Sequence, residues 1–394
     1  MRIMMIAPTP FFADRGCHTR IYGEITALQR LGHEVELVTY GLGRDIEGVK
    51  TVRSYNFPWY KKLTAGPSVW KILLLPFIYH TARKEIKRYN PDIVHAHLHE
   101  GAFIAKFCKT FDKNKKRLYV FDMQGSLSGE IIQHKFVKEN GIFHKFFIAL
   151  EKKINSWFPI ITQSENLYNQ LITMGVEKER IVNAMDAVDT TAFAPTEPDK
   201  ELVHMLDLDN GKKKVLFMGL LESYQGVDYM FDAFGMVKKQ YENVEFIVIG
   251  FPNIDKYRAK AKELGIEKDV KFIGKVRFED VPSYLSLSKI AIAPKIASAE
   301  GDGKIYNYMA MGMSVVAFDR SISREILRDT GIFAKMKDSK DMADKILSLL
   351  NDDELVERLG KAARQRAVDY LSTDISAAKI DEFYKKNLYK KNLK

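Results

Sequence analysis

The chain has 394 residues, 46% of them hydrophobic, which is enough for two or three domains with full cores and excludes a disordered protein. Its two cysteines exclude a disulfide framework, and its longest apolar run, residues 70–79, is well short of the ~20 residues that span a bilayer, so we expect a reducing compartment and no transmembrane segment. The formal net charge is +10, and residues 50–153 carry 20 basic against 8 acidic side chains, interleaved with aromatic ones, a combination that suits an anionic membrane surface or nucleic acid.

Short β-type apolar runs alternate with helical patterns through the first half of the chain. The expected strands are 2–8, 35–40, 92–97, 118–123 and 159–164, and the expected helices are about 19–31, 67–89, 100–111 and, in more than one piece, 127–157. This order predicts a parallel sheet covered by helices on both faces. The apolar start is five residues long and is followed by two prolines, so we expect a buried first strand and not a secretion signal.

A polar, proline-containing stretch, TTAFAPTEPDK, follows Asp189 and is expected to begin a linker over 191–212. The expected strands then continue with 214–219, 244–250, 270–274, 290–294 and 314–318, and the expected helices with about 227–241, 255–264, 279–287, 304–311 and others to the end. We therefore predict two doubly wound α/β domains, 1–190 and 213–372. Ligands of such sheets lie beyond the carboxyl ends of the strands, so two facing sheets would make an interdomain cleft.

The stretch EGDGKIYNYMAMGMSVVAFD, residues 300–319, predicts a helix, a turn and a buried strand. The glycines before the helix allow close backbone approach, while Lys304 and the unpaired N–H groups of the first turn favour an anion such as phosphate. The plainer alternative is an ordinary helix start, with Asp302 as N-cap and Lys304 solvated.

Three histidines alternate in HAHLH, at His95, His97 and His99, so one strand face could present all three and suggest zinc. No carboxylate or cysteine partner is evident near them in the sequence, and we expect no metal. His97, at the strand end, is instead expected to be a polar residue of a ligand cleft.

Several stretches in the same order resemble glycosyltransferase family 4, whose members are retaining enzymes of GT-B architecture. They are PTPFFADRGCHTRIYGEITALQRLGHEVELVT, DIVHAHLHEG, VFDMQGS, ITQSENLYNQLITMGVEKERI, DAVDTTAF, VLFMGLLESYQGVDYMFDAF, VEFIVIG, VKFIGKVRFEDVPSYLSLSKIAIAP and EGDGKIYNYMAMGMSVVAFD. The resemblance implies two Rossmann-like domains, with a nucleoside diphosphate sugar bound by the C-terminal domain and the acceptor mainly by the N-terminal one. It also implies that the last helix, 373–394, packs back on the first domain, and that no metal or other cofactor is needed.

The chain departs from the family pattern at three places. The arginine and lysine that usually bind the diphosphate are replaced by Leu220 and Gln225. Of two glutamates eight residues apart, the second falls on Asn307 and the first on Ala299, beside Glu300. A histidine that often follows the strand 118–123 is replaced by Gln124.

Some other cation must therefore offset the diphosphate, and Lys304 is our first choice because it lies at a helix N-terminus. On the acceptor side we expect catalytic roles for His97, Asp122 and Gln124, with positioning and charge stabilisation in place of an enzymic nucleophile. The expected donor-binding residues are Arg15, Gly16, Lys295, Glu300, Asp302, Gly303, Lys304 and Asn307.

The sequence as a whole predicts a cytoplasmic retaining hexosyltransferase, peripheral on the inner face of the cell membrane, with a sugar or lipid-linked acceptor and no nucleic acid partner. A sugar-nucleotide epimerase of the same fold and a non-catalytic sugar-nucleotide-binding protein are the alternatives. The donor base, the sugar, the linkage and the oligomeric state are not encoded in any pattern we recognise.

Overall fold

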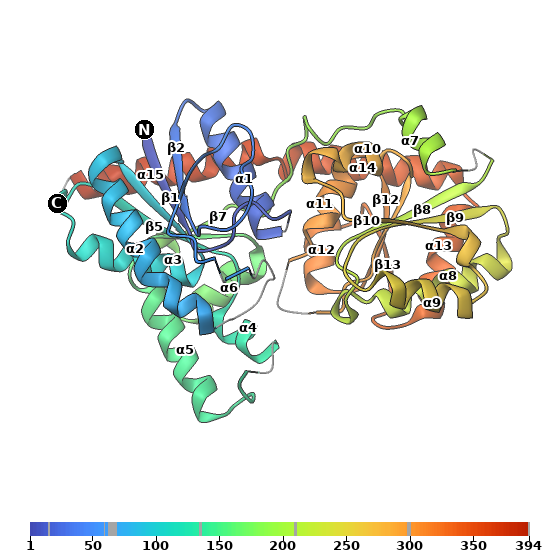
Figure 1. The fold of residues 1–394 in the computed structure, drawn as a ribbon, viewed down its shortest axis with the longest axis horizontal. Helices are drawn as coiled ribbons and strands as arrows, with labels where there is room; N and C mark the ends of the chain where they lie inside the picture. Colours follow the sequence, from blue (N-terminus) through green and yellow to red (C-terminus); the bar gives the residue numbers. More distant parts are fainter. Residues whose placement is uncertain are drawn as a thin grey trace. The chain divides into compact units, whose positions relative to one another are not determined.

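Two parallel sheets organise the chain, one in each of two compact units (Figure 1). The structure is a computed structural model that describes residues 1–14, 16–58, 60–61, 69–133, 136–208, 211–297 and 301–392. The first unit comprises Met1–Asp186 with Thr373–Lys394, and the second comprises Ala187–Ser372. The last helix therefore belongs to the first unit, although it follows the second in the chain.

The first unit has a seven-stranded sheet in the order β3-β2-β1-β4-β5-β6-β7. Its strands are β1 Arg2–Ala7, β2 Glu34–Thr39, β3 Lys50–Arg53, β4 Ile93–His97, β5 Leu118–Met123, β6 Ile160–Thr162 and β7 Ile181–Asn183. Its helices are α1 Gly16–Arg30, α2 Val69–Tyr89, α3 Leu98–Thr110, α4 Leu127–Gln133, α5 Ile142–Asn155, α6 Glu165–Thr173 and α15 Thr373–Asn392. Every residue of β4 and β5 is buried, as expected for parallel strands covered on both faces.

The second unit has a six-stranded parallel sheet in the order β10-β9-β8-β11-β12-β13. Its strands are β8 Lys213–Met218, β9 Val244–Ile249, β10 Val270–Gly274, β11 Ile290–Ala293, β12 Ser314–Phe318 and β13 Ile332–Ala334. Its helices are α7 Lys200–Met205, α8 Val227–Gln240, α9 Ile254–Glu263, α10 Val281–Leu285, α11 Gly303–Ala310, α12 Ser321–Leu327, α13 Ser339–Leu350 and α14 Asp353–Tyr370. One helix, α7, thus lies within the segment 191–212 that the sequence suggested as a linker.

In each sheet the strand order reverses at one place, between β1 and β4 in the first unit and between β8 and β11 in the second. The loops that leave two neighbouring strands diverge to opposite faces there and open a crevice at the carboxyl ends. The prediction of two doubly wound parallel sheets is confirmed, and this topology fixes where side chains for a ligand can gather.

The sequence analysis missed three strands, namely β3, β7 and β13. Each lies at the edge of its sheet and has only three or four residues, most of them half-buried. Such strands leave too short an apolar run to be recognised. The segment expected to be helical over 127–157 consists of two helices, α4 and α5, with 136–141 as a connecting turn.

Candidate functional site

Three cationic side chains gather around Asp302 in the second unit. They come from the carboxyl ends of adjacent strands: Lys295 follows β11, Arg320 follows β12, and Lys304 lies in the first turn of α11 between them. Lys304 Nζ donates to Asp302 Oδ1 at 2.9 Å, and an Arg320 nitrogen lies 3.6 Å from Asp302 Oδ2. All four side chains are buried, so among the described residues the Asp302 carboxylate lies close to three cations out of water.

Lys304 also contacts the loop that follows β8. Its Nζ donates to Gln225 Oε1 at 2.7 Å. Gly219 makes room for this lysine, because a methyl group added there would lie 3.0 Å from Lys304 Cε. Gly226 has φ +73°, and an added methyl would lie 1.8 Å from the Pro294 carbonyl oxygen, so only glycine allows this loop to approach the end of β11. The cations therefore stand at the β8–β11 reversal.

The electrostatics of this group favour an added anion. Burial by itself would raise the pKa of Asp302, but Lys304, Lys295 and Arg320 hold it below its usual value, so Asp302 stays ionised. Burial lowers the pKa of Lys304, and the two neighbouring cations lower it further against the opposing effect of Asp302. A bound anion would relieve this repulsion between like charges.

The plainer reading of the EGDGK segment does not describe the structure. The Lys304 side chain is only 7% exposed, and the Asp302 side chain forms no capping hydrogen bond with α11. Lys295 Nζ donates to the Gly301 carbonyl oxygen at 2.8 Å, which ties the end of β11 to the segment before α11.

The remaining predicted donor residues are less closely grouped. Asn307 lies one turn beyond Lys304 on α11 and is half-buried. Gly303 and Gly16 begin α11 and α1, and a methyl group added at either would meet no described atom within 4 Å, so both backbones are open to close approach. Arg15 and Glu300 lie outside the described residues.

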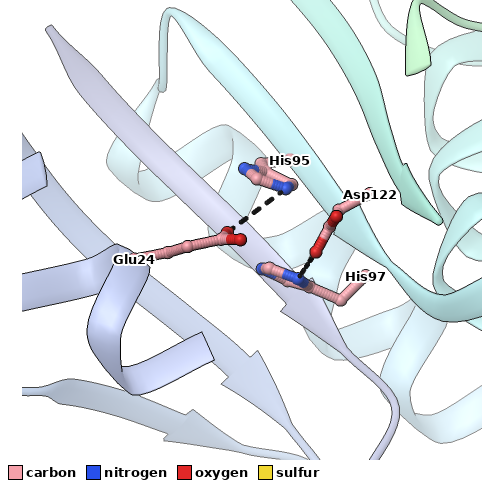
Figure 2. A group of neighbouring side chains, drawn as sticks. All are labelled: Glu24, His95, His97 and Asp122. Atoms are coloured by element: carbon pink, nitrogen blue, oxygen red, sulfur yellow. Dashed lines mark hydrogen bonds and ion pairs between the residues drawn. The ribbon is translucent and has the colours of Figure 1, made fainter. Parts of the chain in front are cut away.

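A second buried cluster lies in the first unit, where α1 crosses the ends of β4 and β5 (Figure 2). His97 Nδ1 lies 2.9 Å from Asp122 Oδ2, and the rings of His95 and His97 stack with centroids 4.3 Å apart. Gln124 Nε2 donates to Asp122 Oδ2 at 2.8 Å and lies 3.1 Å from His97 Nδ1. The three residues expected to be catalytic, His97, Asp122 and Gln124, are thus in mutual contact.

Arg20, on α1, is the cation of this cluster. Its Nε and Nη2 donate to the two oxygens of Asp122 at 3.1 and 2.9 Å, its Nη1 donates to Asp186 Oδ1 at 3.0 Å, and its Nη2 lies 2.9 Å from Glu24 Oε1. His95 Nδ1 meets the hydroxyl of Tyr384 on α15 at 2.6 Å. The guanidinium of Arg20 therefore contacts three carboxyl groups.

Burial sets the charge states in this cluster. It would raise the pKa of Asp122, but Arg20 and His97 hold that pKa far below its usual value. Burial raises the pKa of Glu24 well above its usual value and also raises that of Asp186, despite Arg20 in both cases. Asp122 is therefore the carboxylate that Arg20 keeps ionised, and it also contacts His97 Nδ1.

The expectation for the histidine trio is corrected in two respects. Two carboxylates do lie close to it, since Glu24, His95, His97 and Asp122 offer ligand atoms within 4.8 Å of one another. His99 lies on α3 instead of the strand, with Nε2 4.0 Å from Glu151 Oε1. Because the guanidinium of Arg20 already occupies both oxygens of Asp122, a metal ion here would compete with a cation that the protein itself supplies.

The buried imidazole of His95 should make the first unit sensitive to acid. Burial lowers the pKa of His95 well below its usual value, so the folded chain keeps it neutral while the unfolded chain protonates it near pH 6.5. We expect the free energy of unfolding to fall by ~1.4 kcal/mol per pH unit below that point through this group alone. Glu24, whose pKa is raised, acts in the opposite direction.

Urea unfolding of the His95→Gln variant, followed between about pH 5 and 6.5, checks this effect, with His80→Gln on the exposed face of α2 as the control. We expect the pH slope to be reduced by about one proton in His95→Gln and unchanged in the control. Equal slopes in all three proteins would contradict the neutral assignment of His95.

The sequence analysis did not select Arg20 or Arg320. A signal existed for Arg320, because it follows the end of β12 as Lys295 follows the end of β11. Nothing in the sequence around Arg20 indicated partners that lie 102 and 166 residues away.

Comparisons with known proteins agree with this organisation. Residues 15–191 match the family model described as Glycosyltransferase Family 4, and residues 199–366 match Glycosyl transferases group 1. The phosphatidyl-myo-inositol mannosyltransferase of Mycobacterium leprae is 28% identical over 218 residues, 55% of this chain and 55% of that protein, so the match spans about half the length of this relative.

Two solved structures share the fold over nearly the whole chain. Sucrose-phosphate synthase from Thermosynechococcus elongatus has a TM-score of 0.79 at 16% identity and covers 99% of both chains. Anabaena HepE in complex with UDP-glucose has a TM-score of 0.76 at 15% identity and covers 98% of this chain and 100% of its own. At these identities the likeness establishes the two-sheet architecture alone.

Proposed function

This chain belongs to glycosyltransferase family 4, and we propose that it moves a sugar from a nucleoside diphosphate sugar to an acceptor with retention of anomeric configuration. One observation carries the proposal, namely the group of Lys304, Arg320 and Lys295 at the β8–β11 reversal of the second unit. The diphosphate of the donor is an anion that these cations can bind, and the cations would take the place of the arginine and lysine pair that is usual in the family.

The proposed division of roles follows from chemistry. Negative charge grows on the leaving diphosphate as the sugar departs, so the cations stabilise the transition state more than the ground state. We assign Asn307, one turn along α11, to the nucleoside, and the open backbone at Gly303 to the phosphates. The leaving phosphate then accepts the acceptor proton, and neither a protein nucleophile nor a metal ion takes part.

On the acceptor side we assign different tasks to the three residues of the first unit. Gln124 is the only one of the three that is not fully buried, and it is the group that touches substrate. Asp122 contacts His97 Nδ1 and so holds the orientation of the imidazole ring next to Glu24 and His95 (Figure 2).

We propose a lipid-linked acceptor at the inner face of the cell membrane. A similar protein is named for mannosyl transfer to phosphatidyl-myo-inositol, and the basic, aromatic-rich part of this chain lies in the first unit. No helix in the described ranges is both long enough and apolar enough to cross a bilayer.

Incubating the full chain with a panel of UDP-, GDP- and ADP-sugars, with and without a bacterial lipid extract, tests the proposal. We expect release of a nucleoside diphosphate with one base, dependent on the extract. Conversion of the donor to a second sugar nucleotide without acceptor would replace the proposal by an epimerase. Binding of one donor with no turnover under any condition would replace it by a non-catalytic binding protein.

A further inference from the structure

The stretch that leads into α5 and the first turns of this helix expose aromatic and aliphatic side chains in the first unit. Figure 1 shows α5 running away from the sheet of its unit, with its first turn at the far end. We call the following four residues the α5 tip, with the exposed fraction of each: Phe136 59%, Ile142 81%, Phe143 67% and Phe146 60%. Four large apolar groups so close together in sequence, and so exposed, are unusual on a soluble surface.

The two ends of α5 differ in what holds them. Glu151, fully buried near its C-terminal end, accepts hydrogen bonds from Ser126, from the Leu127 backbone N–H and from Ser128 at 2.7 to 3.2 Å, which fixes α5 to the start of α4. Ile154 and Asn155 are buried on the same side. The first two turns of α5 instead expose Ile142 and Phe146, four residues apart on one face. The C-terminal end of α5 is thus fixed to α4 by hydrogen bonds, while its N-terminal end exposes apolar side chains.

Positive charge flanks the α5 tip. Between residues 136 and 155, the exposed charged side chains are Glu139 and four lysines, Lys138, Lys145, Lys152 and Lys153. Lys153 continues the exposed face of Ile142 and Phe146 two turns further along α5, at helical spacing. An apolar end followed by cations is the pattern of a helix that enters the headgroup region of an anionic membrane, since aromatic rings favour the interface and each lysine near the surface adds attraction.

We propose that the α5 tip inserts into an anionic lipid surface and so holds the first unit at the membrane. This inference rests on the proposed function, because a lipid surface is where the enzyme would find a lipid-linked acceptor. Its test needs neither a sugar donor nor turnover. Charge complementarity favours an anionic lipid surface over an apolar protein groove, because exposed Lys138 and Lys145 lie beside the apolar end in the sequence and Lys152 and Lys153 continue the positive charge along α5.

Sedimentation of the full chain with vesicles, without donor or acceptor, tests the proposal. Vesicles of phosphatidylcholine mixed with phosphatidylglycerol are compared with phosphatidylcholine alone, at low salt and with duplex DNA as competitor. We expect binding to the anionic vesicles only, weakened by salt. Phe143→Ser/Phe146→Ser should bind about tenfold more weakly or worse, whereas Met205→Ser/Tyr370→Ser, which removes two equally exposed groups from the second unit, should bind like the parent.

Tryptophan fluorescence can show whether the α5 tip itself touches the lipid. The Phe143→Trp variant should show a blue-shifted emission with anionic vesicles that lipid-borne bromine quenches. The proposal is overturned if the parent does not sediment with anionic vesicles, or if the Phe143→Ser/Phe146→Ser variant sediments as the parent does. It is also overturned if that variant turns a dimeric parent into a monomer, because the tip would then cover a second copy of the chain. Failure of the sugar-nucleotide panel would leave these measurements unaffected.

Discussion

Replacing Lys304 by methionine is expected to lower kcat by roughly 30- to 1,000-fold with the donor and acceptor that the sugar-nucleotide panel identifies. Methionine keeps an apolar stem beside Gly219 but removes the ammonium that contacts Asp302 and Gln225 and lies over the Phe217 ring. Because the lost charge acts mainly on the leaving diphosphate, KM for the donor should change much less than kcat. Steady-state kinetics of nucleoside diphosphate release measure both.

A charge swap makes this test sharper. Gln225 stands where the family pattern has a lysine, and its Oε1 lies 2.7 Å from Lys304 Nζ. The double variant Lys304→Gln/Gln225→Lys delivers an ammonium to the same place from the opposite loop and should recover part of the turnover that Lys304→Gln loses. Lys268→Met, on the exposed surface of the second unit, is the control. If kcat were unchanged in a folded Lys304→Met protein while Lys295→Met lost turnover, the phosphates would be assigned to another strand end.

Replacing Arg20 by methionine is expected to lower the free energy of unfolding of the first unit by about 3–5 kcal/mol. The change leaves Asp122, Glu24 and Asp186 around one buried point without their shared cation. Urea unfolding followed by tryptophan fluorescence reports on this unit alone, because the only tryptophans in the sequence all fall within residues 1–186: Trp59, Trp70 and Trp157.

The matched control for Arg20→Met is Arg30→Met on the same helix. Arg30 forms an ion pair with Asp374 at 2.7 Å, with both side chains largely exposed, and its removal should cost less than ~1 kcal/mol. The loss in Arg20→Met should also shrink as the pH falls, since Asp122 without Arg20 is a buried carboxyl that protonates readily. If the free energy of unfolding fell equally in the two variants, Arg20 would contribute no more to stability than an exposed ion pair does.

The doubly wound sheets could be predicted because their central strands are continuous apolar runs, as in RIMMIA and SVVAF, separated by long helical patterns. The edge strands could not, since Lys50–Arg53, Ile181–Asn183 and Ile332–Ala334 are short and only partly apolar. The start of α1 at Gly16, three residues before the expected one, shows the usual uncertainty of a helix end that has no apolar pattern in its first turn.

The candidate site was predicted where a single segment carries the signal and missed where distant segments meet. Lys304 and Asp302 are two residues apart, so their place at the start of a helix could be read from EGDGK, and the anion site there stays a prediction. The contact of Lys304 with Gln225 joins residues 79 apart, and the sequence presented them only as two separate departures from a pattern. The carboxylates beside the histidines of β4 were missed for the same reason, because Glu24 comes from α1 and Asp122 from β5.

The position of α15 has a consequence for how the protein is made. Residues 373–392 complete the first unit, where Tyr384 and Ile380 are fully buried and Tyr384 meets His95. The ribosome must translate the whole of Ala187–Ser372 before it reaches them, which takes roughly 10 to 40 seconds at ordinary elongation rates. At the end of that interval the second unit has its full sequence, whereas the first still lacks its last helix. The nascent chain therefore presents the uncovered face of α1 to water or to a chaperone until residues 373–392 have been translated.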